Sequence, residues 1–229
     1  MKQPILRSNF KRLLMQKELY LTKDNHEEKV AQWIAECRKM KKYIAFDFDI
    51  SKSVLLVLDM QNFFLNDSNH AFVPSAKTII GYISKLVEFF QKNNRPVIFT
   101  KHLDSQEPKE MMTRWWRDSI EEGTVEAEVT SSLNTEDAIT ITKDRYSAFE
   151  RTDLERILRD YNIEQIILTG IMSHLCCETT ARDAFMKDFE VIYIIDATAT
   201  YTEQLHLGTI RAISHGFGRC LSTEEILND

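Results

Sequence analysis

The feature that most constrains the fold of this chain is a set of short apolar runs in which polar residues do not alternate with apolar ones. A strand that is buried on both faces has this pattern, because neither face meets water. The clearest runs are Ser53–Asp59 (SVLLVLD), Pro96–Thr100 (PVIFT), Gln165–Gly170 (QIILTG) and Val191–Asp196 (VIYIID). Such strands are typical of parallel sheets that carry helices on both faces.

The segments between these runs carry apolar residues at helical spacing, which predicts that helices and strands alternate. Helices are expected over Ser75–Asn93, Lys109–Glu122, Asp153–Tyr161, Glu178–Asp188 and Glu203–His215, and further strands over Ala138–Thr142 and Arg219–Ser222. Together these elements predict an α/β fold, a three-layer α/β/α sandwich with a Rossmann-like parallel sheet of about six strands.

The first 50 residues differ from the rest of the chain in being the most polar part, with mixed charges. Helices are expected there over Phe10–Tyr20 and His26–Tyr43. We therefore predict an N-terminal helical extension over residues 1–50 that packs on a main domain over residues 51–229.

Net charge, apolar runs and cysteine content indicate which binding partners and which cellular compartment to expect. The net charge of −6 disfavours non-specific binding to nucleic acid. No apolar run reaches the roughly 18 residues that a membrane span needs, and the N-terminus lacks the pattern of a secretory signal. Four scattered cysteines are too few for a disulfide framework in a chain of 229 residues. A reducing, cytoplasmic compartment is the resulting prediction.

Three reactive side chains follow predicted strands and are therefore expected at one edge of the sheet. Asp59 ends the first run, where burial would raise the pKa of its carboxyl group. Lys143 follows Ala138–Thr142. Cys176 lies where the strand over Gln165–Gly170 turns into a helix, and a helix N-terminus would lower the pKa of its thiol.

Each of the three has an ordinary structural alternative: Asp59 as a cap, Lys143 as a surface charge and Cys176 as a buried packing residue. An acid, a cation and a thiol at the ends of three strands nevertheless form a constellation suited to nucleophilic catalysis. Adjacent Cys177 is expected to face the core instead.

The segments that carry these residues resemble the signature segments of the isochorismatase-like cysteine hydrolases. These are LLVLDMQNFF, ITKDRYSAFERTDLERIL and TGIMSHLCCETTARDAFMKDFEVIYIIDATAT, and the resemblance covers residues 53 to 222. It implies that Asp59, Lys143 and Cys176 form the catalytic triad. It also implies a cis peptide bond at Ile171–Met172 and an oxyanion hole built from the backbone amides of Met172 and Cys176.

The implied reaction is hydrolysis of a small molecule, most simply of a non-peptide C–N amide bond through a thioester on Cys176. The alternative within the family is isochorismatase-type cleavage of a vinyl ether, which uses Asp59 and does not need the thiol. A third interpretation keeps the fold as a binding protein without turnover.

Nicotinamidases of this family bind a metal through a D-x-H…H arrangement, and this chain departs from it. The stretch TKHLDSQEPKE supplies His102 and Asp104 in the opposite order and no second histidine. We therefore predict no metal and no other cofactor.

Residues near the motifs are candidates for substrate contact. Gln61, Phe64, Trp116, Tyr146 and Phe149 are the predicted substrate-binding set, with Phe63, Trp115, Arg114 and Arg145 as further candidates that are equally compatible with core or surface positions. Glu203 and His206 follow DATAT, where family helices often form subunit contacts. The resemblance thus implies a homo-oligomer, a dimer or a tetramer.

Overall fold

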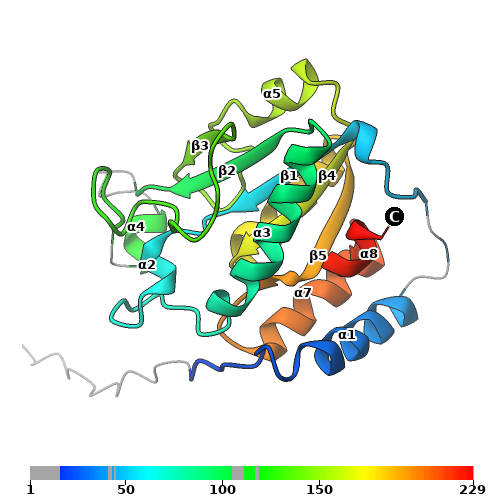
Figure 1. Ribbon diagram of the computed structural model, residues 1–229. Coiled ribbons are helices and arrows are strands. Elements are labelled where there is room, and N and C mark those ends of the chain that lie inside the picture. The colour runs from blue at the N-terminus through cyan, green and yellow to red at the C-terminus, as the bar shows by residue number, and fades with distance from the viewer. Residues whose placement is uncertain (1–15, 41–42, 44, 105–110, 117–118, 229) are drawn as a thin grey trace, which may run out of the picture.

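The computed structural model describes residues 16–40, 43, 45–104, 111–116 and 119–228. Six parallel strands form one sheet in the order β3-β2-β1-β4-β5-β6 (Figure 1). Their bounds are Ser53–Leu58 (β1), Val97–His102 (β2), Ile139–Lys143 (β3), Gln165–Ile171 (β4), Glu190–Ala199 (β5) and Arg219–Leu221 (β6). The predicted parallel six-stranded α/β fold is confirmed.

The continuous apolar runs belong to the centre of the sheet. Every residue of β1 and β4 is buried, because both strands are covered on both faces. At the edge strand β3, by contrast, Thr140 and Thr142 are exposed and Ile141 is buried. A continuous apolar run therefore indicates a central strand, and alternation with polar residues indicates an edge strand.

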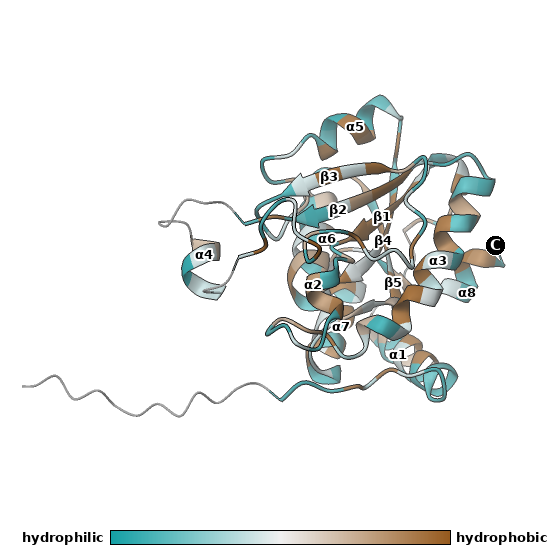
Figure 2. Cartoon of the chain, turned by 60° about the vertical axis from the view of Figure 1, so that its left-hand side comes forward, coloured by the Kyte–Doolittle hydropathy of each residue, from teal (hydrophilic) through white to brown (hydrophobic). Residues whose placement is uncertain are grey.

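Helices cover both faces of the sheet. Figure 2 shows α3 (Ala76–Lys92) and α8 (Thr223–Leu227) on one side of the strands, and α6 (Glu178–Met186) and α7 (Glu203–Gly216) on the other. Short helices α2 (Asn62–Leu65), α4 (Met111–Trp116) and α5 (Leu154–Asp160) complete the set. Right-handed crossovers explain why the helices lie on both faces of the sheet. Strands are added toward one edge from β1 to β3 and toward the other edge from β4 to β6, so the connecting helices of the two halves pack on opposite faces.

The structure differs from the sequence prediction at several helices. Residues 16–20 carry no helix, and the remainder of the helix predicted over 10–20 lies outside the described residues. Helix α4 is shorter than the predicted 109–122, parts of which are also outside the described residues. Helix α8 was not predicted from the sequence, although Ser222 and Glu225 form a capping box at its start.

Helix α1 (His26–Met40) packs on α7 through buried apolar and polar contacts. Glu203 accepts hydrogen bonds from the Lys29 ammonium at 2.7 Å and from the Trp33 indole at 3.0 Å. His206 is completely buried, and its ring lies 4.5 Å from that of Trp33. Glu203 and His206 therefore contact the N-terminal part of the same chain, and a role of this helix in subunit contacts stays a prediction.

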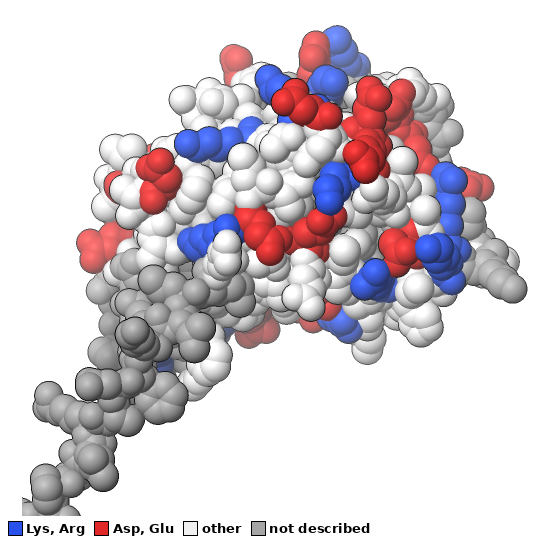
Figure 3. Space-filling view, turned by 90° about the horizontal axis from the view of Figure 1, so that it is seen from below, with Lys and Arg blue, Asp and Glu red and all other residues white. Residues whose placement is uncertain are grey.

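Charged side chains of both signs are interleaved on the face that Figure 3 shows. Ion pairs such as Arg211 with Glu36, at 2.8 Å, join α7 to α1. Among the described residues, no helix has the length and apolar character needed to span a membrane.

Gly170 allows the two central strands to approach each other closely. Its φ is +105°, and a Cβ atom added there would lie 2.1 Å from the carbonyl oxygen of Leu58. A Gly170→Ala substitution therefore combines a left-handed backbone with a clash against β1, and we expect it to cost about 3 kcal/mol of unfolding free energy.

Urea unfolding measures this cost. Gly81→Ala is the matched control, because Gly81 lies inside α3 with open space at its Cβ position. The control is expected to be neutral or slightly stabilising. A Gly170→Ala protein as stable as the wild type would contradict the role assigned to this close approach.

Candidate active site

Reactive side chains from four neighbouring strands meet at the carboxyl edge of the sheet. In sheet order, Lys143 ends β3, Thr100 and His102 lie in β2, Asp59 follows β1, and Cys176 follows β4. The order of strands reverses between β1 and β4, and open α/β sheets bind ligands at such a reversal. The predicted meeting of Asp59, Lys143 and Cys176 is thus present in the structure.

Asp59 is held in place by its backbone and by β2. Its φ of +52° ends the strand and turns the side chain toward the site. Its Oδ1 accepts a hydrogen bond of 2.6 Å from the Thr100 hydroxyl, whose oxygen also accepts one of 3.2 Å from the Asp59 amide. With only 1% of its surface exposed, the carboxyl group has a fixed orientation.

Lys143 links the acid to the thiol. Its Nζ lies 2.7 Å from Asp59 Oδ2 and 3.4 Å from Cys176 Sγ, and it donates a 2.9 Å hydrogen bond to the Arg145 carbonyl. The Nδ1 atom of His102 lies 3.5 Å from the same ammonium. Lys143 is 2% exposed, so the alternative of a solvated surface charge is excluded.

The expectation that burial would raise the pKa of Asp59 is wrong. Burial does act in that direction, but the Lys143 and His102 charges and the hydrogen bonds from Lys143 and Thr100 outweigh it, and the pKa is lowered. Burial alone would lower the pKa of Lys143, but the interactions of its ammonium with the Asp59 carboxylate and with the Cys176 sulfur outweigh burial and raise that pKa. The resting state is therefore an Asp59 carboxylate paired with a Lys143 ammonium.

Cys176 lies in a π-helical turn, Ser173–Cys177 (η2), that joins β4 to α6. Its thiol is buried, and burial raises its pKa to about 12, while the Asp59 carboxylate adds to the shift and the Lys143 cation opposes it. The expected lowering by the helix terminus is therefore wrong for the resting state. The thiol is protonated there, next to a carboxylate that can accept its proton.

The turn before the nucleophile has the backbone that the resemblance implied. The Ile171–Met172 peptide bond is cis. The Met172 carbonyl accepts hydrogen bonds from the amides of Leu175 and Cys177, at 3.0 and 3.2 Å. The assignment of the Met172 and Cys176 amides to an oxyanion hole stays a prediction.

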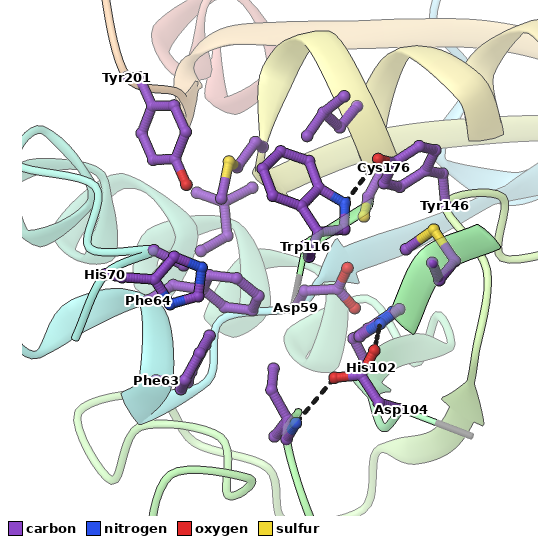
Figure 4. Close-up of a pocket in the computed structure, with 16 residues that line it drawn as sticks. Asp59, Phe63, Phe64, His70, His102, Asp104, Trp116, Tyr146, Cys176 and Tyr201 are labelled. Atoms are coloured by element: carbon purple, nitrogen blue, oxygen red, sulfur yellow. Dashed lines mark hydrogen bonds and ion pairs between the residues drawn. The ribbon is translucent and has the colours of Figure 1, made fainter. Parts of the chain in front are cut away.

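A cavity opens over Asp59 and Cys176, and its wall includes the aromatic rings of Phe63, Phe64, Trp116, Tyr146 and Tyr201 (Figure 4). Its open space, with the mouth and adjoining solvent included, is about 550 Å³. Three predicted contact residues, Phe64, Trp116 and Tyr146, belong to its wall, and the Trp116 indole donates a 2.8 Å hydrogen bond to the Tyr146 hydroxyl.

Two other predicted substrate contacts lie elsewhere. The amide of Gln61 is completely buried, donates to the carbonyls of His102 and Ala127, and accepts from the His102 amide. Phe149 packs against Phe189, with ring centres 6.0 Å apart. Neither is part of the cavity wall, because Gln61 joins backbone segments and Phe149 belongs to the core.

Of the further candidates for substrate contact, one lies in the cavity wall and the others do not. Phe63 lines the cavity, whereas Trp115 and Arg114 on α4 are exposed. Arg145 contributes its carbonyl to Lys143 rather than a charge to the cavity wall.

Sequence reasoning missed the cavity residues that come from loops, above all His70 and Tyr201. His70 follows α2 in a polar loop, and Tyr201 follows β5, so neither lies in one of the recognised motifs. The strand predicted over Val191–Asp196 ends before Ala199, where β5 ends, so no direct signal in the sequence pointed to Tyr201.

The two residues that come nearest to the metal-binding pattern, His102 and Asp104, are engaged with each other. His102 Nε2 lies 3.2 Å from Asp104 Oδ1, and Asp104 Oδ2 accepts a 2.7 Å hydrogen bond from the Ile120 amide. Among the described residues, no three His, Cys, Asp or Glu side chains form a group that could hold a metal ion. This arrangement does not fit the metal of the nicotinamidases, and the absence of a cofactor stays a prediction.

The raised pKa of Cys176 predicts an unusual pH dependence of its alkylation. Only the thiolate reacts, so the rate with iodoacetamide is expected to rise roughly tenfold per pH unit up to pH 10, whereas a free thiol levels off near about pH 9. Peptide mass spectrometry measures the rate at Cys176, with glutathione as the control. A plateau below pH 9 would contradict the buried, protonated thiol.

Comparisons with known proteins agree with this geometry. The model of the isochorismatase domain matches residues 53–225. Nicotinamidase 3 of Arabidopsis thaliana is 33% identical over 180 residues, which is 76% of this chain and 86% of that protein. Enterobactin synthase component B of Escherichia coli is 31% identical over 183 residues, 79% of this chain, but the match spans only 64% of that longer protein.

A solved structure has the same fold. The cysteine hydrolase from Pseudomonas syringae superimposes with a TM-score of 0.78 at 24% identity, over 82% of this chain and 96% of that one.

Proposed function

This chain belongs to the isochorismatase domain family of hydrolases, and on that premise we propose that it cleaves a non-peptide C–N amide bond of a small molecule through a thioester on Cys176. The observation that carries the proposal is the contact between the three groups. Lys143 Nζ lies 2.7 Å from the Asp59 carboxylate and 3.4 Å from the Cys176 sulfur, at the cavity that Asp59 and Cys176 line.

The first half of the reaction forms the thioester. Asp59 accepts the thiol proton as the Cys176 sulfur attacks the carbonyl carbon, and the C=O electron pair moves onto oxygen. The Met172 and Cys176 amides donate to that oxyanion. When the C–N bond breaks, the protonated Asp59 returns its proton to the leaving nitrogen, which departs as ammonia or an amine.

The second half regenerates the enzyme. Water attacks the thioester carbon while Asp59 accepts a proton from it, and when the C–S bond breaks the acid leaves and Asp59 returns that proton to the Cys176 sulfur. Lys143 keeps its charge throughout, so it stabilises the Asp59 carboxylate before attack and developing negative charge at sulfur. A buried cation can do this strongly, because little water screens it.

The charge of the cavity supports a neutral substrate. Of the described residues that line it, Asp59 and Asp104 are acids and none is Lys or Arg. A substrate with several carboxylates would meet no cationic partner among these described lining residues. Aromatic walls instead suit a flat or apolar group beside the amide.

Vinyl-ether cleavage is the second candidate, because relatives at 31% and 34% identity are named enterobactin synthase component B and isochorismatase. In that reaction Asp59 would act as the proton donor. Its lowered pKa keeps Asp59 ionised in the resting site, without a proton to donate, which favours the amide reaction.

A screen for ammonia and pyruvate release tests the two against each other. Small neutral aromatic and aliphatic amides form one arm, and isochorismate forms the other. Ammonia release from an amide supports the proposal, and pyruvate release without any amide turnover would replace it with the vinyl-ether reaction.

A further inference from the structure

The N-terminal segment of residues 17–21 lies against one side of the active-site cavity, and nothing in the proposed chemistry uses it. Lys17 donates a hydrogen bond from its ammonium to the carbonyl of His70, and the same ammonium lies 4.5 Å from the ring centre of Tyr201. Both partners line the cavity, and Figure 4 shows them on the same side of it. One side chain thus joins two pieces of the cavity wall.

Residues next to Lys17 also form hydrogen bonds with the turn that carries Tyr201. The Glu18 amide donates a 2.8 Å hydrogen bond to the Tyr201 carbonyl, and the Glu18 carboxylate accepts one of 3.0 Å from the Glu203 amide. The Tyr20 hydroxyl accepts a 3.0 Å hydrogen bond from the Thr200 amide. The turn between β5 and α7 is therefore fixed by residues from the start of the chain.

The same segment also holds the other piece of wall. The amides of Tyr20 and Leu21 donate to the hydroxyl oxygen of Ser75, at 3.1 and 3.2 Å, and the Leu21 carbonyl accepts a 2.9 Å hydrogen bond from Thr78. Ser75 ends the loop that carries His70 and leads into α3. The segment consequently spans from one loop of the cavity to the other.

Exposure places these contacts at the cavity mouth. His70 is exposed, whereas Tyr201 is only 7% exposed under the Lys17 side chain. Lys17 thus joins the exposed His70 loop to the buried Tyr201 ring at this mouth. The segment precedes the residues that match the family domain, 53–225, so the domain motifs carry no information about it.

We infer that Lys17 is a positioning residue that sets the width of the cavity mouth, and thereby excludes reagents and substrates with a bulky group next to the reactive centre. The inference rests on the proposed function only in taking the cavity over Cys176 as the substrate site. Lys17 bridges the His70 loop and the Tyr201 turn through one partly exposed side chain, while the backbone contacts of residues 18–21 remain when that side chain is changed. Its loss is therefore expected to remove the link between the His70 carbonyl and the Tyr201 ring, and so to widen the mouth there, without unfolding the protein.

Two maleimides of different size measure the width of the mouth directly. Rates of Cys176 modification by N-methylmaleimide and N-phenylmaleimide are followed by peptide mass spectrometry, each normalised to glutathione. In Lys17→Met the ratio of the phenyl rate to the methyl rate is expected to rise about fivefold, which corresponds to roughly 1 kcal/mol in the barrier to entry.

Two further variants separate this role from a general structural one. Lys17→Arg keeps a cationic donor and is expected to retain the wild-type ratio. Lys23→Met removes a lysine from the exposed turn before α1, and is expected to change nothing. An unchanged ratio in Lys17→Met, or the same rise in Lys23→Met, would overturn the inference.

The maleimide ratio does not depend on turnover, so it distinguishes this inference from the proposed function. If the maleimide ratio rises in Lys17→Met but the wild type hydrolyses no amide, the role of Lys17 is supported and the amidase proposal is contradicted. With an amide substrate in hand, Lys17→Met is expected to change KM across substrates of different size while kcat for the smallest one stays within about twofold.

Discussion

Replacing Cys176 with alanine is expected to lower kcat/KM for an amide substrate by at least about 10⁴-fold, because the thioester cannot form without the sulfur. The fold should tolerate the change, since the thiol contributes one contact to Lys143 and lies at the cavity floor. The measurement is the initial rate of ammonia release, together with a urea unfolding curve for each protein.

Cys177→Ala is the matched control for this substitution. Cys177 is the next residue, is completely buried, and its thiol lies 4.0 Å from the Thr169 carbonyl on the core side of the turn. We expect this variant to lose some stability but to keep its turnover. Full activity in Cys176→Ala would contradict the thioester route, and pyruvate release by the same variant would favour the vinyl-ether reaction.

Replacing Asp59 with asparagine is expected to remove activity and also to destabilise the protein by about 3–5 kcal/mol. The activity is lost because the proton acceptor is gone. The stability is lost because the Lys143 ammonium, 2.7 Å from Asp59 Oδ2 and 2% exposed, would keep a buried charge without its counter-charge. Lys143→Met should destabilise for the reverse reason.

The double variant Asp59→Asn/Lys143→Met separates these two effects. With neither charge buried, the free energy of unfolding should recover toward that of the wild type, whereas turnover should stay absent. Urea unfolding and ammonia release measure the two properties. A double variant as unstable as the sum of the single variants would contradict the assignment of this ion pair.

The same pair predicts the direction of the acid response. The pKa of Asp59 is lower in the folded protein than in the unfolded chain, so its contribution to stability is present above the unfolded value of about 3.9 and is lost as the pH falls through the folded value. Asp59→Asn lacks this contribution, so the difference in stability between wild type and variant should shrink below about pH 4. Urea unfolding of both proteins between pH 7 and about pH 3 measures it, and a difference that grows toward low pH would contradict the lowered pKa.

The sheet and the meeting of Asp59, Lys143 and Cys176 at its edge could be predicted from the sequence, because both depend on local patterns. Fully buried strands have unbroken apolar runs, and Asp59 and Lys143 stand directly at strand ends. The charge state of the site could not be predicted in the same way. The pKa of Asp59 follows from Lys143 and His102, which belong to other strands, and the burial of Cys176 outweighs its position at a helix start.

The cavity wall was predictable only in part, for a related reason. Phe64, Trp116 and Tyr146 lie close to the recognised motifs, but His70, Tyr201 and Lys17 meet through tertiary contacts between segments far apart in the chain. Gln61 lies close to Asp59 in the sequence. Its side-chain amide nevertheless donates hydrogen bonds to the carbonyls of His102 in β2 and of Ala127 in a loop, and it does not reach the cavity wall. Closeness to a sequence motif therefore predicts the residues at the floor of the cavity better than those in its wall.

Rapid acid quenching followed by mass spectrometry tests the central claim most directly. During turnover of an amide substrate by the wild type, the peptide that contains Cys176 is expected to gain the mass of the substrate acyl group, and the gain should be absent in Cys176→Ala and present in Cys177→Ala. Turnover without any adduct on Cys176, at a rate that Cys176→Ala matches, would contradict a thioester mechanism.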